Sequence, residues 1–111
     1  MGFWSRLVPA KKGFRRPNGQ LPSNRELIRE RDGRRCWLCG DRMHFNAPAN
    51  SDLSPTEEHL VSRSRGGKDV MANTVLCHRK CNVLLGNRRK SEKEKMRRQM
   101  QAARREAWRG R

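Results

Sequence analysis

The residues with the clearest chemistry in this chain are four cysteines and a histidine. Cys36 and Cys39 are separated by two residues, and a second group follows at Cys77, His78 and Cys81. A structural zinc ion takes four cysteine or histidine ligands arranged as a tetrahedron, and two such turns supply two ligands each. His78 keeps the two-residue gap to Cys81, whereas Cys77 would need a wider gap. We favour His78 as the fourth ligand, with Cys77 as the alternative.

A second group of polar residues lies between these cysteine turns. Glu58 and His59 are adjacent, and Asn73 follows His59 by fourteen positions. Asn82 follows nine positions later, directly after the last cysteine. Phosphodiester hydrolysis requires an activated water and a cation that neutralises charge on the phosphate. Histidine titrates near neutral pH and suits a general base, and glutamate and asparagine oxygens suit a hard divalent cation.

This ordered set, with a glycine pair at 66 and 67, resembles the HNH nuclease family, in particular the small HNH proteins of bacteriophages and restriction systems. The resemblance covers residues 36–88, about half of the chain. It implies that His59 activates the water and that Asn73 braces the loop that orients His59. It also implies that Glu58 and Asn82 hold a catalytic Mg²⁺, Mn²⁺ or Ni²⁺ ion, distinct from the structural Zn²⁺.

The resemblance also implies a fold. We expect an α+β protein with a ββα-metal (HNH) motif and a structural zinc site, flanked by helices and basic tails. The expected parts are a flexible basic arm over 1–22, the zinc-stapled nuclease domain over 23–90 and a basic helix over 91–111. The chain departs from the usual family pattern at three positions: Glu58 stands where most relatives have Asp, Asn82 where many have His, and Ser62 where a proline is common.

Local sequence signals predict the elements of that fold. A capping box at Ser23 and Glu26 begins a helix that ends near Gly33. Extended segments are expected over 57–61 and 74–77, with a turn over 63–69 between them. A helix over 79–89 follows, and its predicted buried residues are Val83, Leu84 and Leu85.

A long polar helix is predicted over 91–109. Ser91 and Glu94 form a second capping box at its start. Met96, Met100 and Ala107 lie near one face, with Trp108 beside them. This apolar stripe is thin, so we expect the helix to dock against the domain or a partner.

The composition favours a metal staple and an intracellular setting. Only 33% of the residues are hydrophobic and 34% are charged, which leaves little apolar surface for a core. Four cysteines fit either disulfides or a metal. Because no apolar run has the length of a signal peptide or a membrane span, we expect thiolates on metal in a reducing compartment. If the chain is phage-encoded, that compartment is the cytoplasm of a bacterial host.

The charge of the chain indicates a polyanionic partner. The formal net charge is +16 over 111 residues. Residues 1–22 hold five basic and no acidic residues, and residues 88–111 hold eleven basic residues against three acids. Such side chains contact phosphates and carry little sequence information. The expected DNA contacts around the motif are Arg63, Arg65, Lys68, Arg79, Lys80, Arg88 and Arg89.

We therefore expect an endonuclease that nicks or cuts DNA with a divalent ion. The phage-type resemblance implies a role beside the DNA packaging machinery, with the terminase large subunit as a partner and no membrane. Two other functions stay open at this point. The chain is also compatible with a non-catalytic zinc module that binds nucleic acid, and with a basic interaction protein for an acidic partner.

Overall fold

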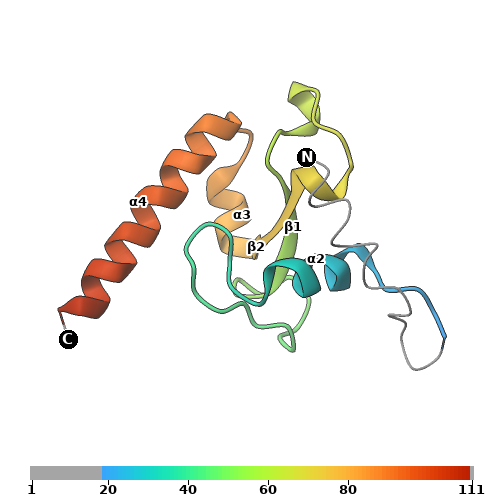
Figure 1. The fold of residues 1–111 in the computed structure, drawn as a ribbon, viewed down its shortest axis with the longest axis horizontal. Coiled ribbons are helices and arrows are strands. Elements are labelled where there is room, and N and C mark those ends of the chain that lie inside the picture. The colour runs from blue at the N-terminus through green and yellow to red at the C-terminus, as the bar shows by residue number, and fades with distance from the viewer. Residues whose placement is uncertain (1–18, 111) are drawn as a thin grey trace.

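The protein is described by a computed structural model over residues 19–110 (Figure 1). The elements are α2 (Asn24–Asp32), β1 (Pro55–His59), the 3₁₀ turns η1 (Arg63–Arg65) and η2 (Met71–Asn73), β2 (Thr74–His78), α3 (Arg79–Leu85) and α4 (Lys90–Arg109). β1, β2 and α3 form a ββα unit, so the predicted α+β fold class is confirmed. Most of the predicted basic arm, up to residue 18, lies outside the described residues, and the three-part division of the chain stays a prediction.

α2 begins and ends where its capping residues predict. The Glu26 N–H donates to Ser23 Oγ at 3.2 Å, and the Ser23 N–H donates to Glu26 Oε1 at 2.9 Å. Gly33 ends the helix with φ of 88°, which a residue without a Cβ adopts at little cost. Ile28 is fully buried and attaches the helix to the core.

The two strands form an antiparallel hairpin in which Glu58 lies opposite Val75 and His59 lies opposite Thr74. The strand predicted over 57–61 begins two residues earlier and ends at His59. It ends there because Asn73 provides the next contacts: its carbonyl accepts from the Leu60 N–H at 2.9 Å, and its side chain replaces a further strand partner. His59 therefore stands at the last position of a strand.

α3 is shorter and less buried than predicted. It ends at Leu85 rather than at 89, because Gly86 takes a φ of 51°. Leu85 is buried, but Val83 and Leu84 are 68% and 53% exposed, so their predicted burial is wrong. The helix covers the hairpin with the edge formed by Cys81 and Leu85, and Val83 and Leu84 lie away from that edge.

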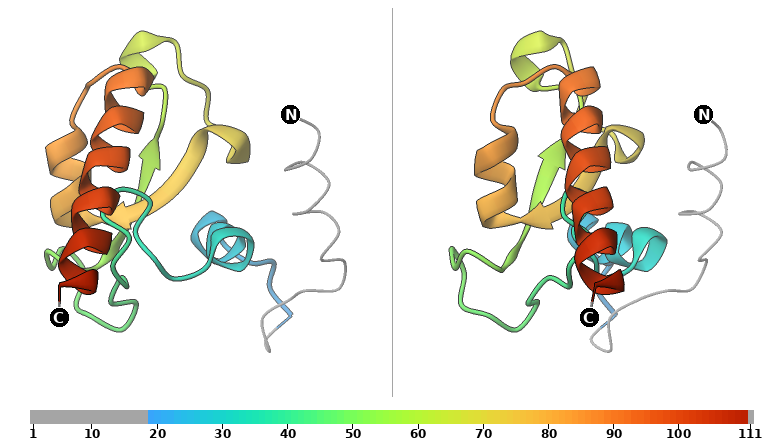
Figure 2. Two further views of the ribbon diagram at one scale, coloured as in Figure 1. Left: turned by 60° about the vertical axis from the view of Figure 1, so that its left-hand side comes forward. Right: turned by 90° about the vertical axis from the view of Figure 1, so that its left-hand side faces the viewer.

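α4 begins at Lys90, one residue before the predicted start. The Arg89 N–H donates to Glu92 Oε1 at 3.1 Å. The predicted capping box of Ser91 and Glu94 is wrong, because the helix has already begun at Ser91. Figure 2 shows α4 lying beside α3 and the hairpin in two views.

The docking face of α4 is only partly the predicted one. Met96 and Met100 pack against the core as expected. Ala107 is exposed and Trp108 is 71% exposed, so the predicted stripe does not extend to the end of the helix. The most buried residue of α4 is instead Lys93, with 1% of its surface exposed.

The core is small and rich in sulfur. Its buried apolar residues are Ile28, Cys36, Leu38, Met43, Val75, Leu76, Cys77, Cys81 and Leu85. Three of these nine residues are cysteines, so thiols that could bind a metal lie inside the core. In the described part of the chain, no helix combines the length and the apolar composition needed to cross a membrane.

We predict that Gly67→Ala destabilises the protein far more than Gly66→Ala. A Cβ on Gly67 would lie 1.7 Å from the carbonyl oxygen of Val61, which forces the loop after β1 to move. A Cβ on Gly66 meets nothing within 4 Å and carries only the penalty of φ +86°. We expect losses of about 3 kcal/mol for Gly67→Ala and about 1 kcal/mol for Gly66→Ala, measured by chemical denaturation. Equal losses would contradict this account of the loop.

Candidate functional site

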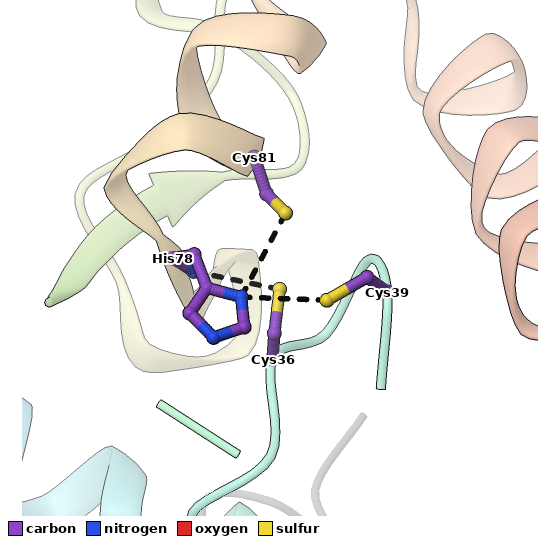
Figure 3. A group of neighbouring side chains, drawn as sticks. All are labelled: Cys36, Cys39, His78 and Cys81. Atoms are coloured by element: carbon purple, nitrogen blue, oxygen red, sulfur yellow. Dashed lines mark hydrogen bonds between the residues drawn. The ribbon is translucent and has the colours of Figure 1, made fainter. Parts of the chain in front are cut away.

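Three thiols and one imidazole meet where the 36–39 turn contacts β2 and α3 (Figure 3). The ligand atoms of Cys36, Cys39, His78 and Cys81 all lie within 4.8 Å of one another. His78 Nδ1 lies 3.3 Å from Cys39 Sγ and 3.8 Å from Cys81 Sγ. Ligand atoms around a tetrahedral zinc ion are separated by roughly 3.3 to 3.8 Å, given the usual metal–ligand bond lengths. This cluster of three cysteines and one histidine therefore fits a structural zinc site.

The ring of His78 is held in the orientation that a metal ligand needs. Its Nε2 lies 2.8 Å from the carbonyl oxygen of Arg42. Because a carbonyl can only accept, Nε2 carries the proton and Nδ1 presents its lone pair to the three sulfurs. The backbone N–H of His78 also donates to Cys36 Sγ at 3.4 Å.

Cys77, the alternative ligand, lies beside the cluster rather than in it. Its side chain is fully buried, and its thiol donates to the sulfur of Cys36. This hydrogen bond is the largest cause that lowers the pKa of Cys36 to about 4. Burial raises the pKa of Cys39 and of Cys81. One thiolate is thus favoured before any metal binds, and zinc must displace protons from the other two.

The turn between Cys36 and Cys39 lies between β2 and α4. The Trp37 N–H donates to the Leu76 carbonyl at 3.0 Å. On the other side, the Trp37 carbonyl accepts from Arg97 Nε at 2.8 Å and from Gln101 Nε2 at 3.0 Å. The guanidinium of Arg97 also lies 5.0 Å from the centroid of the Trp37 ring, a cation–π contact. α4 is therefore fastened to the candidate zinc site.

Three of the four residues predicted for the catalytic site gather at an open cavity of about 460 Å³ next to the hairpin. Glu58 and His59 reach it from β1, and Asn82 reaches it from the first turn of α3. The other residues that line the cavity are Glu57, Ser62, Arg63, Ser64, Gly86 and Asn87. Residues separated by 23 positions in the chain therefore share one surface, to which Arg63 adds a positive charge and Glu57 a negative one.

Asn73 lies outside this cavity and holds the loop that follows His59. Its Oδ1 accepts from the Val61 N–H at 2.9 Å. Its Nδ2 donates to the carbonyl oxygens of Val61 and Lys68, both at 3.0 Å. One side chain thus joins the two ends of the loop between β1 and η2, which restricts the backbone next to His59.

His59 has a carboxylate partner that the sequence analysis missed. Its Nε2 lies 2.5 Å from Asp69 Oδ1, and Arg63 Nε donates to the same oxygen at 2.9 Å. The hydrogen bond from Arg63, followed by the one from His59, lowers the pKa of Asp69. Asp69 is the only acidic residue between positions 59 and 91, and that isolation was the signal available in the sequence.

Asn82 is fixed against β1 by its amide nitrogen. The Nδ2 atom donates to Thr56 Oγ1 and to the carbonyl oxygen of Glu57, both at 3.2 Å. These contacts hold the start of α3 on the strand that carries His59. The amide nitrogen is therefore used for structure, and the side-chain oxygen is the atom with ligand chemistry.

Glu58 is buried and paired with a lysine that the sequence analysis also missed. Glu58 is 6% exposed, and its Oε2 lies 2.7 Å from Lys93 Nζ. The same ammonium donates to the His59 carbonyl at 2.7 Å and to Ser62 Oγ at 3.2 Å. In the sequence, Lys93 is indistinguishable from the other basic residues of α4.

Six of the seven predicted DNA-binding residues are exposed, and Arg79 is half-buried. Arg63 lines the cavity itself. Arg65 Nε donates to the Asn87 carbonyl at 3.0 Å, which holds η1 close to the end of α3. Arg79 lies 3.5 Å from a carboxylate oxygen of Asp52 and is partly neutralised by it.

The hairpin, the following helix and the cluster of three cysteines and one histidine define a ββα module with a cluster that fits a structural zinc ion. Residues 36–88, which are 53 of the 111 residues, match the family model described as HNH endonuclease. The match begins at the first zinc ligand and includes the hairpin and α3. No curated protein and no solved structure matches the chain.

We predict that Cys77→Ala retains one zinc ion per chain, whereas His78→Ala loses most of it. Removing Cys77 takes away a hydrogen bond to Cys36 but no ligand. Removing His78 leaves three thiols and an open coordination position, and replacement of Cys81 should have the same effect. Elemental analysis of the dialysed proteins measures the zinc content of each variant, and thermal unfolding measured in parallel shows whether each variant is folded. Loss of zinc from Cys77→Ala with retention in His78→Ala would reverse the ligand assignment.

Proposed function

We propose that the protein is a metal-dependent endonuclease that hydrolyses phosphodiester bonds in DNA. The observation that carries this proposal is the meeting of Glu58, His59 and Asn82 at one cavity, inside a segment that matches the HNH endonuclease family model. A pure binding module has no need for a carboxylate, an imidazole and an amide in this arrangement. The net charge of +16 supports a nucleic-acid substrate.

His59 would act as the general base. Its Nε2 faces the Asp69 carboxylate, and a proton on Nε2 shared with that carboxylate leaves the lone pair of Nδ1 to accept a proton from water. Because the pKa of Asp69 is lowered, its carboxylate stays ionised at neutral pH. Asp69 is in this account a positioning residue, as is Asn73 through the loop.

The oxygens of Glu58 and Asn82 would hold the divalent cation, Mg²⁺, Mn²⁺ or Ni²⁺. Carboxylate and amide oxygens are hard ligands that such ions accept, and both residues line the cavity next to His59. The ion, when bound, would neutralise charge on the phosphate and the leaving oxygen. Arg63 at the cavity and the exposed basic residues around it would hold the DNA backbone.

The predicted place of the protein in phage DNA packaging, with the terminase large subunit as partner, stays a prediction. So does its cytoplasmic location in a bacterial host. The rival function, a non-catalytic zinc module that binds nucleic acid, differs from the nuclease in one respect that an experiment measures: it gives His59 no role.

We predict that the zinc-loaded protein nicks supercoiled plasmid when Mg²⁺, Mn²⁺ or Ni²⁺ is added, and that His59→Ala lowers the rate by roughly 10²- to 10⁴-fold, the usual contribution of a general base. DNA binding and unfolding temperature should be unchanged. His44→Ala is the matched control, because His44 is exposed and lies outside the cavity. If the wild-type protein binds DNA and cuts under none of these conditions, the zinc-module account becomes the better one.

We also predict that Asp69→Asn lowers kcat by roughly 10- to 100-fold, the typical effect of removing a partner that orients a functional histidine. KM for DNA should also change, because Asp69 holds Arg63, a predicted DNA contact, through the same oxygen; the effect on His59 is therefore read from kcat together with the tautomer. Asp41→Asn is the control, since Asp41 also pairs with an arginine, Arg104, but at the zinc side of the molecule. Nitrogen NMR of His59 should show a mixture of tautomers in Asp69→Asn. Unchanged kcat and an unchanged tautomer would remove Asp69 from the mechanism.

A further inference from the structure

Lys93 is a buried cation that contacts two residues of the candidate active site, Glu58 and His59. Its side chain is 1% exposed, although it belongs to a helix whose other charged residues are exposed or half-buried. Three oxygens surround its ammonium: Glu58 Oε2, the His59 carbonyl and Ser62 Oγ. Burial of an ammonium is unfavourable unless each of its protons has a partner. The ammonium donates hydrogen bonds to the His59 carbonyl and to Ser62 Oγ. Glu58 Oε2 contacts it as an ion pair and has no hydrogen-bond partner among the described residues.

All three partners belong to the segment from Glu58 to Ser62, which contains His59. Lys93 therefore restrains the carboxylate of Glu58, the backbone carbonyl of His59 and the hydroxyl of Ser62. Ser62 occupies the position where the family often has proline, and here its hydroxyl accepts from the ammonium at 3.2 Å. A proline at this position would leave one proton of the ammonium without that partner.

The position of Lys93 depends in turn on the candidate zinc site. Lys93, Arg97 and Gln101 are spaced by four residues and lie on one face of α4. Arg97 and Gln101 donate to the carbonyl of Trp37, between the first two zinc ligands. α4 is thus attached at one end of this face to the zinc site and at the other to Glu58.

The ion pair changes the charge that a divalent cation meets. Glu58 is the only charged residue of the proposed ligand pair, since Asn82 is neutral. With Lys93 Nζ at 2.7 Å from one oxygen of Glu58, the combined charge of the ligands and the lysine is zero. Affinity for divalent cations rises with the number of charged ligands, and a second cation close to a buried ammonium is repelled. The protein alone is therefore a poor divalent-cation site.

We propose that Lys93 makes tight binding of the catalytic cation conditional on DNA. This inference rests on the proposed nuclease function. In the free protein, Lys93 neutralises Glu58, and the cation binds weakly. A phosphate of bound DNA adds negative oxygens to the same cavity and compensates for the charge of Lys93, so the ion and the substrate bind cooperatively. Lys93 thereby opposes occupation of the site by an ion before DNA has bound.

The test is a Mn²⁺ titration of the zinc-loaded full chain, followed by electron paramagnetic resonance, with and without a short duplex. His59→Ala is used as the background to prevent cleavage, and the duplex alone is titrated to subtract its own Mn²⁺ binding. We expect the duplex to tighten Mn²⁺ binding at least tenfold. Equal Mn²⁺ affinity with and without the duplex would overturn the proposal. This comparison uses protein that keeps Lys93, so it does not depend on whether a Lys93 variant folds.

Two substitutions sharpen the result. Lys93→Gln keeps an amide donor but removes the charge, and it should tighten Mn²⁺ binding without DNA about tenfold and reduce the effect of the duplex. Lys93→Arg keeps the charge and should bind Mn²⁺ as weakly as the parent protein. Arg104→Ala, at an exposed pair on the same helix, controls for general loosening of α4. Unchanged or weaker Mn²⁺ binding in a folded Lys93→Gln would contradict the proposal.

Glu58→Gln separates this inference from the function on which it rests. If Glu58→Gln, on a wild-type His59 background, still cuts DNA and its His59→Ala form binds Mn²⁺ normally with the duplex, the metal assignment fails, and with it the role of Lys93. If Glu58→Gln neither cuts nor binds the ion, while Lys93→Gln binds it no more tightly than the parent, the nuclease stands and the inference about Lys93 fails.

Discussion

The structure depends on the junction at which three thiols and one imidazole join two distant parts of the chain. Cys36 and Cys39 lie in a turn after α2, and His78 and Cys81 lie at the end of β2 and the start of α3. With nine buried apolar residues, three of them cysteines, the core has little apolar surface with which to hold these parts together. Structural zinc sites contribute roughly 10 to 16 kcal/mol of apparent binding energy in small domains, which is enough to make folding depend on the metal.

That junction also determines the geometry of the cavity. Asn82 directly follows Cys81, so the same turn of α3 that carries a zinc ligand carries a residue of the cavity. Its amide nitrogen then bonds to β1 at Thr56 and Glu57, next to Glu58 and His59. The candidate zinc site and the cavity thus share the first turn of α3, through the adjacent residues Cys81 and Asn82. Displacement of either Cys81 or the hairpin would change the distance between Asn82 and His59.

Hydrogen bonds from polar side chains hold the loops and α4 in place, as an apolar core does in larger domains. Asn73 closes the loop after β1 with three hydrogen bonds, and Asp69 joins His59 to Arg63 across the same loop. α4 docks chiefly through Lys93, Arg97 and Gln101, each bonded to a group on the domain. Hydrogen bonds are directional, so such contacts orient the site residues more strictly than apolar packing would.

Several features could be predicted from the sequence alone because they depend on residue type and short spacing. The capping box at Ser23 determines where α2 begins, and the hairpin follows from two extended segments separated by a glycine turn. The grouping of Glu58, His59 and Asn82 also came from order and spacing, since the ββα motif fixes those separations. The boundaries of α3 and α4 were less predictable, because Gly86 ends one helix and Glu92 caps the next within a few polar residues.

Only the tertiary structure decided which polar residues meet. Val83 and Leu84 are exposed because just one edge of α3 contacts the hairpin, and no local signal distinguishes them from Leu85. Asp69 reaches His59 because the loop folds back, and Lys93 reaches Glu58 from another helix, 35 positions later in the chain. Helix periodicity and residue type predict that a lysine in a basic helix is exposed to solvent. The burial of Lys93 follows from the geometry with which α4 is attached to the zinc site, a property of the assembled fold and of no segment within it.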